Sequence, residues 1–219
     1  MARRLCAQCQ RPICACICAF ISKTYNKTPV LVLQHPSEVK QSKGTVALLQ
    51  RSLHSCRVLI GEDFSDNDEL IDLLAQNQGL LLYPGEQAQD LLLSVHQCDE
   101  EDSQSIERKP PLLIILDGTW KKAYRMYRLS KNLHSLTQVC LPDVIANKGK
   151  YLIRKVAKKN ALSSLEATCY ALALLEGELA TSFTDNKVLE ATTPIDCGPY
   201  QALLNKFSLF NQFQLSFRK

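Results

Sequence analysis

Short, continuous runs of apolar residues alternate along the chain with stretches in which apolar residues recur at helical spacing. The continuous runs lie at residues 30–33, 58–60, 80–83, 112–116 and 139–141. Such runs leave no polar face, and they predict strands that are buried on both sides, as in a parallel sheet covered by helices.

The intervening stretches predict helices. Helical spacing covers residues 45–54, 66–76, 121–129, 163–178 and 200–215. Asp66 is expected to cap the second of these helices, which should stop before Gly79. Alternation of strand and helix over about 200 residues predicts an α/β fold with a mainly parallel sheet.

Length and composition fit one domain with a small N-terminal appendage. The chain has 219 residues, of which 46% are hydrophobic and 22% charged, so whole-chain disorder is excluded. We expect a cysteine segment at residues 1–24 and a catalytic or binding domain at 25–219. No apolar run has membrane-spanning length, and no apolar stretch follows Arg3 and Arg4, so a cytoplasmic location is expected.

Ten cysteines are many for a cytoplasmic protein, and five of them fall within the first 18 residues: Cys6, Cys9, Cys14, Cys16 and Cys18. Paired thiolates at short spacing suit a tetrahedral zinc site, with an iron–sulfur cluster or unliganded thiols as alternatives. The remaining cysteines are expected to be small buried apolar residues: Cys56, Cys98, Cys140, Cys169 and Cys197.

Charge is segregated along the chain, although the net charge is only +4. Two blocks contain basic residues and no acidic ones: Lys121, Lys122, Arg125, Arg128 and Lys131 in the first, and Lys148, Lys150, Arg154, Lys155, Lys158 and Lys159 in the second. These blocks favour a polyanion such as nucleic acid as partner, the alternative being solvated helix surfaces.

Four predicted strand ends or helix starts carry distinctive residues, at 34–38, 83–86, 117–120 and 163–166. Ligands of open parallel sheets bind at the carboxyl ends of the strands. None of the four matches a Rossmann or P-loop phosphate motif, which disfavours those nucleotide-binding folds.

Each of these segments also has a purely structural interpretation. Tyr83-Pro84-Gly85 suits a turn, Ser163 and Glu166 suit a capping box, and His35 suits a hydrogen-bonded core position. The segment 117–120 suits a helix cap. Its sole tryptophan, however, lies beside an aspartate immediately before a basic helix, which combines an acid/base candidate with a stacking surface.

The segment Asp117-Gly118-Thr119-Trp120 resembles the Asp-x-Thr-Trp signature of the DTW-domain family, the tRNA-uridine aminocarboxypropyltransferases. Further motifs follow the family's order along the chain: the cysteine-rich start, His35-Pro36-x-Glu38, Tyr83-Pro84-Gly85, and Arg154-Lys155 followed by Ser163-Ser164-Leu165-Glu166. The chain departs from the family at Gly44, where an asparagine is expected, and at Ser164, where a threonine is expected.

The resemblance implies a SPOUT-like α/β fold, knotted near its C-terminal half. It also implies transfer of the 3-amino-3-carboxypropyl group from S-adenosylmethionine to N3 of a tRNA uridine, expected in the variable loop. Asp117 is the expected catalytic base, with Trp120 beside it in the catalytic site. Zinc would be structural, and the family's start favours Cys16 and Cys18 over Cys14 beside Cys6 and Cys9.

The remaining candidate residues divide between cofactor and RNA. Cofactor binding is expected of Tyr83, Pro84, Gly85, Leu116, Thr119, Ser163, Ser164 and Glu166. RNA binding is expected of His35, Lys121, Lys122, Arg125, Arg154, Lys155, Lys158 and Lys159. Two alternatives stay open: an RNA methyltransferase that uses the same cofactor, and a non-enzymatic, zinc-containing RNA-binding protein.

Overall fold

Six parallel strands form the centre of the molecule. The computed structural model describes residues 4–85, 87–91, 109–146, 162–177 and 196–217. Its strands are β1 (Val30–Gln34), β2 (Cys56–Ile60), β3 (Gln78–Leu82), β4 (Gln89–Asp90), β5 (Pro111–Asp117) and β6 (Thr137–Cys140). Their order is β2-β1-β5-β3-β6-β4, and every neighbouring pair is parallel, as predicted.

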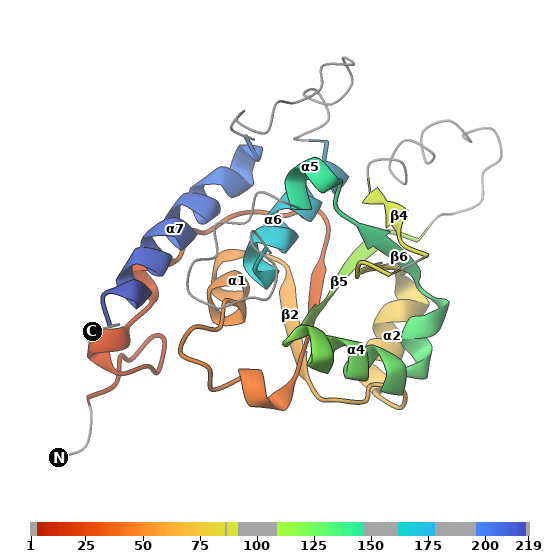
Figure 1. Ribbon diagram of the computed structural model, residues 1–219, viewed down its shortest axis with the longest axis horizontal. Helices are drawn as coiled ribbons and strands as arrows, with labels where there is room; N and C mark the ends of the chain where they lie inside the picture. The colour runs from red at the N-terminus through yellow and green to blue at the C-terminus, as the bar shows by residue number, and fades with distance from the viewer. Residues whose placement is uncertain (1–3, 86, 92–108, 147–161, 178–195, 218–219) are drawn as a thin grey trace.

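Helices cover both faces of this sheet (Figure 1). On one face lie α1 (Val46–Ser52), α6 (Ser164–Leu175) and α7 (Gln201–Leu215). On the other lie α2 (Asp68–Gln76) and α4 (Trp120–Leu129). The short helix α5 (Asp143–Ala146) follows β6, and 3-10 turns lie at Ile13–Ala15 (η1), Cys18–Phe20 (η2), Pro36–Glu38 (η3), Lys131–Ser135 (η4) and Gly198–Tyr200 (η6).

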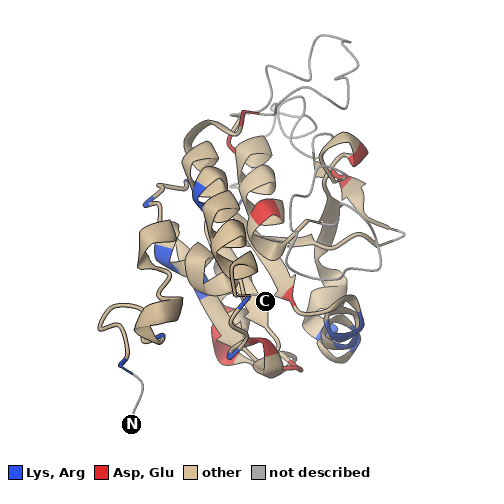
Figure 2. Ribbon diagram, turned by 60° about the vertical axis from the view of Figure 1, so that its left-hand side comes forward, with Lys and Arg blue, Asp and Glu red and all other residues tan. Residues whose placement is uncertain are grey.

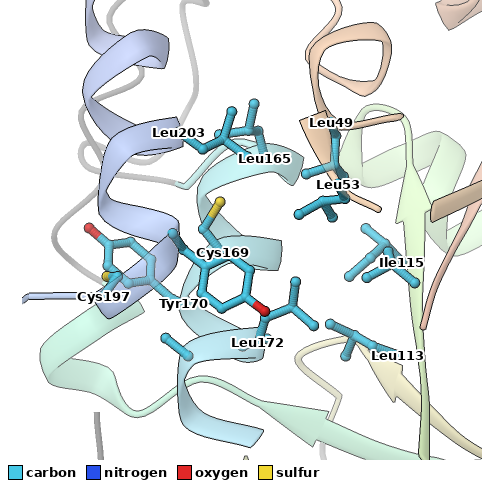
Figure 3. Close-up of a cluster of buried hydrophobic side chains, with 14 of the residues drawn as sticks. Leu49, Leu53, Leu113, Ile115, Leu165, Cys169, Tyr170, Leu172, Cys197 and Leu203 are labelled. Atoms are coloured by element: carbon cyan, nitrogen blue, oxygen red, sulfur yellow. The ribbon is translucent and has the colours of Figure 1, made fainter. Parts of the chain in front are cut away.

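The two helical layers explain why the strands read as continuous apolar runs. Val30 and Val32 of β1 belong to the core under α1, α6 and α7, whereas Leu31 and Leu33 belong to the core under α2 and α4. Figure 3 shows the first core, in which Leu113 and Ile115 of β5 face the side chains of α6. Successive strand residues point to opposite faces, so both parities must be apolar.

The cysteine segment packs against α7. Ile17 is buried, and the ring of Phe20 lies 5.7 Å from that of Phe210 and 5.2 Å from that of Phe213. The described N-terminal segment therefore lies against the last helix of the chain (Figure 1).

Sequence and structure differ in a few elements. Asp66 does not cap α2, because the side chain of Asn67 accepts the hydrogen bond from the Leu70 N–H, at 2.9 Å. The two-residue strand β4 and the four-residue helix α5 were not predicted. Cys169 and Cys197 are buried as predicted, whereas Cys56 and Cys140 are partly exposed and Cys98 lies outside the described residues. No described helix has the length and apolarity needed to cross a membrane.

Candidate functional site

Asp117 lies where three elements meet at the carboxyl edge of the sheet. It is the last residue of β5, and Gln34 is its register partner at the end of β1. The Gln34 amide donates to Oδ2 of Asp117 at 3.0 Å, and the Ser164 hydroxyl at the start of α6 donates to Oδ1 at 2.7 Å. The carboxylate is thus buried and oriented on both oxygens.

The start of α6 is held by the predicted capping box. The Ser163 hydroxyl accepts from the Glu166 N–H at 3.2 Å, and the Glu166 carboxylate accepts from the Ser163 N–H at 2.9 Å. Because Ser163 makes the cap, the neighbouring hydroxyl of Ser164 is free to reach Asp117. The positive end of the helix macrodipole therefore lies beside the strand end, where it favours an anionic ligand.

The segment after Asp117 turns directly into α4. Thr119 caps the helix by accepting from the Lys122 N–H at 3.4 Å. A Cβ on Gly118 would come within 3.1 Å of the Lys122 Cβ and 3.7 Å of the His35 Cβ, so this turn passes close to its neighbours. Leu116 is buried in β5, whereas Thr119 and Trp120 are exposed, with 58% of Trp120 accessible to solvent.

His35 links the end of β1 to this turn. Its backbone N–H donates to the Asp117 carbonyl oxygen at 3.0 Å. Because the ring Nδ1 accepts from the Ser37 N–H at 3.1 Å, the ring proton lies on Nε2, which donates to Glu62 at 2.6 Å. Glu62 also pairs with Arg125 of α4 at 3.2 Å.

Lys122 joins α4 to the same β1 loop. Its ammonium lies 2.8 Å from the buried Glu38 carboxylate and 2.6 Å from the Ser37 hydroxyl. Two residues expected to bind RNA, His35 and Lys122, therefore make intramolecular contacts that fix the loop after β1 against α4.

The predicted turn after β3 lies beside an aromatic cluster. Tyr83 stacks on Tyr127 of α4, with ring centroids 5.4 Å apart and an interplanar angle of 15°. Burial, together with Tyr124 and Tyr127, raises the pKa of the Tyr83 hydroxyl. The Gly85 N–H returns to the Tyr83 carbonyl oxygen at 2.9 Å, which closes the turn around Pro84.

A second site lies in the cysteine segment. The Sγ atoms of Cys6, Cys9, Cys16 and Cys18 all lie within 4.8 Å of one another. Two pairs, Cys6 with Cys18 and Cys9 with Cys16, are separated by 3.7 Å. A zinc–sulfur bond of about 2.3 Å gives a tetrahedron with edges of about 3.8 Å, so the four thiols fit a zinc ion. Cys14 is exposed and lies outside this group.

The four clustered thiols share hydrogen bonds and differ in acidity: the pKa values of Cys6 and Cys9 are lowered, whereas those of Cys16 and Cys18 are raised. The Cys6 N–H donates to the Arg11 carbonyl oxygen at 2.8 Å, and the Gln10 N–H donates to the Cys6 carbonyl oxygen at 2.9 Å. These two hydrogen bonds fold residues 6–11 into a tight loop. Hydrogen bonds from the backbone of Cys9 and Gln8 lower the pKa of the Cys6 thiol to about 6. A lowered pKa favours the thiolate, which is the form that binds metal.

Some expected residues are not placed. Arg154, Lys155, Lys158 and Lys159 lie outside the described residues. Lys121 is exposed on α4. The sequence placed Gln34 in the distinctive segment 34–38 but indicated no role for it, and it gave no signal for Glu62.

Comparisons with known proteins agree on one family. A family model described as the DTW domain matches residues 3–215. The chain is 33% identical over 181 residues to a protein of Drosophila melanogaster named tRNA-uridine aminocarboxypropyltransferase 2, covering 80% of this chain and 67% of the fly protein. The Mus musculus protein of the same name is 32% identical over 183 residues, covering 78% and 56%.

A more distant relative is named tRNA-uridine aminocarboxypropyltransferase A, from Arabidopsis thaliana. It is 26% identical over 139 residues, covering 59% of this chain and 52% of the plant protein. The chain thus spans between about half and two thirds of the length of these relatives. No solved structure matches it significantly.

Proposed function

Since this chain belongs to the DTW-domain family, we propose that it transfers the 3-amino-3-carboxypropyl group of S-adenosylmethionine to N3 of a uridine in tRNA. The expected target is a uridine of the variable loop, and the expected by-product is 5′-methylthioadenosine. The observation that carries the proposal is the Asp117 carboxylate, held at the junction of β1, β5 and α6 beside an exposed tryptophan.

The chemistry requires a base near N3. Transfer forms a bond from N3 to the Cγ of the aminocarboxypropyl chain, breaks the Cγ–S bond and releases the N3 proton. S-adenosylmethionine supplies the sulfonium that activates this carbon and leaves as a neutral thioether. The protein selects this carbon over the methyl group by the geometry in which it holds the nucleophile.

Asp117 is suited to receive the N3 proton. A carboxylate has about four lone-pair sites, and Gln34 and Ser164 occupy two of them. The remaining lone pairs can accept the N3 proton of a uridine that has been turned out of its base stack. The exposed ring of Trp120 would hold that base in place.

The surrounding residues would bind the cofactor. Ser163, Ser164 and Thr119 lie at helix starts, where backbone N–H groups favour the cofactor carboxylate. Leu116 and the turn Tyr83-Pro84-Gly85 would contact its apolar parts at the ends of β5 and β3. Glu166 would act indirectly, because its carboxylate is engaged in the capping box.

The four clustered cysteines would hold a structural zinc ion, because four thiolates leave no open position for catalysis. The SPOUT-like knot stays a prediction, since residues 147–161 and 178–195 lie outside the described chain.

Incubation of the protein with S-adenosylmethionine and unmodified tRNA tests this proposal. Mass spectrometry should find aminocarboxypropyl-uridine among the nucleosides and methylthioadenosine in solution. Methylated uridine with S-adenosylhomocysteine would instead establish the methyltransferase alternative. Tight tRNA binding with no product from either reaction would favour the non-enzymatic one.

A further inference from the structure

Helix α4 carries two parallel stripes of side chains, one aromatic and one basic. Residues at positions i, i+4 and i+7 of a helix lie along one line of its surface. The aromatic stripe consists of Trp120, Tyr124 and Tyr127, and the basic stripe consists of Lys121, Arg125 and Arg128. Ala123 and Met126 face the core, so the stripes belong to the remaining, outward-facing surface.

The aromatic stripe is open to solvent at its start. Trp120 is 58% exposed and Tyr124 is 55% exposed, although both are large rings. Tyr127 is half-buried and stacks on Tyr83, so the stripe runs from the Asp117 turn toward the end of β3. Exposed aromatic rings at regular spacing indicate a binding surface rather than a core.

The basic stripe lacks acidic neighbours in the sequence and is only weakly paired. No aspartate or glutamate occurs from residue 118 to 142. Arg125 pairs with Glu62, but 67% of the Arg125 side chain is exposed. An exposed ion pair contributes little free energy, so a phosphate can replace Glu62 as the partner of Arg125 at little cost. Figure 2 shows the basic residues gathered on this helix.

We propose that this face of α4 binds a single-stranded RNA segment whose bases stack on Trp120 and Tyr124 while its phosphates contact Lys121, Arg125 and Arg128. Stacking rings beside a line of cations are the recurring features of single-strand nucleic-acid sites. Residues 120–127 span about 10 Å, enough for about three stacked nucleotides. The identity of the RNA, unpaired nucleotides next to the target uridine, rests on the proposed function; the binding surface does not.

Trp120 is the only tryptophan of the chain, and its fluorescence therefore reports on this surface directly. The probe is an unstructured RNA of about 10 nucleotides that alternates adenosine and cytidine. It contains no uridine, so none of its bases can be modified and the titration reports binding alone. We expect saturable quenching of the Trp120 emission as bases stack on the ring.

Variants at two positions test both stripes. Tyr124→Ala should weaken oligonucleotide binding by roughly five- to 150-fold, whereas Tyr124→Phe, which keeps the ring, should stay within about twofold. Arg128→Ala should weaken binding and reduce the slope of log affinity against log salt by about 0.7. The matched controls are Tyr25→Ala and Arg57→Ala, which remove an exposed tyrosine before β1 and an exposed arginine near the start of β2. Both controls should bind as the wild type does.

Besides unchanged binding by the Tyr124→Ala and Arg128→Ala variants, four results would overturn the proposal. One is the absence of quenching, and another is equal weakening in the control variants. A third is equal competition by polyglutamate, which would assign the surface to acidic proteins. The fourth is Trp120 emission that depends on protein concentration without RNA, which would assign it to self-association. If tRNA is modified normally while these variants bind the oligonucleotide unchanged, this inference fails alone; if the oligonucleotide binds as described but no uridine is modified, the proposed function fails alone.

Discussion

Asp117 is a carboxylate that the fold orients before any ligand arrives. Gln34 holds one of its oxygens and Ser164 the other, and the side chain is buried at the sheet edge. This arrangement suits a base that must meet N3 in one geometry, but it equally suits an aspartate that only fastens α6 to the strand ends. A substitution that preserves both hydrogen bonds separates the two roles.

Asp117→Asn is such a substitution. The new amide can turn its oxygen to the Gln34 amide and its NH₂ to Ser164, whose hydroxyl can rotate to accept. If Asp117 is the base, single-turnover transfer at saturating cofactor and tRNA should fall by roughly 10²–10⁴, while binding and melting temperature stay near those of the wild type. A folded variant that reacts within about tenfold of the wild type would exclude the catalytic role.

Lys122 and Arg125 are neighbours on α4 with different partners. Lys122 pairs with Glu38, which is 4% exposed, whereas Arg125 pairs with Glu62, which is 38% exposed. Lys122→Met removes the ammonium from a buried carboxylate and should lower the free energy of unfolding by about 2 kcal/mol or more. Arg125→Met should cost less than about 1 kcal/mol but should weaken tRNA binding.

Denaturant unfolding and a tRNA titration of both variants check this difference. The isosteric Glu38→Gln, combined with Lys122→Met, should recover part of the lost stability, because it removes the buried charge whose ammonium partner has been replaced. Full stability of Lys122→Met, together with a loss of tRNA affinity as large as that of Arg125→Met, would instead make Lys122 an RNA contact.

At the scale of elements, the continuous runs of apolar residues were the main basis for predicting the strands. All five expected strands form. The central strands β1 and β5 are buried on both faces as predicted, whereas β2, at the edge of the sheet, is only partly buried and exposes Arg57 and Ile60. The helix boundaries agree within a few residues, since caps such as Ser163 are chemically distinctive. The cap of α2 was misplaced by one residue because aspartate and asparagine cap helices equally well and stand side by side at Asp66 and Asn67.

The elements that were missed are those with too few residues to show a period. β4 has two residues and pairs with β6. α5 has four residues and follows β6 in the chain. Strand alternation is recognised over about four to eight residues and helical periodicity over about 11 or more, so neither element is long enough to show a pattern.

For the cysteine segment, we predict that loss of the metal lowers the thermal stability of the protein. If Cys6, Cys9, Cys16 and Cys18 bind zinc, the purified protein should contain about one equivalent, and Cys9→Ser should lose both metal and thermal stability. The stability loss should extend beyond the segment, because its Ile17 and Phe20 pack into the core with α7.

Cys14→Ser is the matched control, because Cys14 is exposed and lies outside the cluster. It should retain the full metal content and melt as the wild type does. Protein prepared without chelator that contains no metal by elemental analysis would contradict the zinc site.

At the scale of the whole molecule, the site depends on strand order, which the sequence does not encode locally. β5 lies between β1 and β3, so Gln34 and Asp117, 83 residues apart, become register partners. Sequence reasoning could place distinctive residues at strand ends, but not decide which ends are adjacent. The contact from Ser164 to Asp117 likewise follows from how α6 packs on the sheet. Motif resemblance pointed to these residues individually; only the fold shows that they touch.

The basic block at residues 148–159 supports a final prediction. Lys155, Lys158 and Lys159 precede α6 in the chain, and α6 begins at the carboxyl edge beside Asp117. Replacing all three by alanine should weaken tRNA binding similarly for different tRNAs. It should also reduce the slope of log affinity against log salt by about three units or fewer, because each lysine neutralises at most one phosphate. The matched control replaces Lys27, Arg57 and Lys109, which lie near the amino-terminal ends of β1, β2 and β5, away from Asp117. Because the control changes the net charge equally, a specific contact predicts a much smaller effect from it. Equal slopes for the two triple variants would show that tRNA responds only to net charge and would rule out the 148–159 block as a phosphate-binding segment.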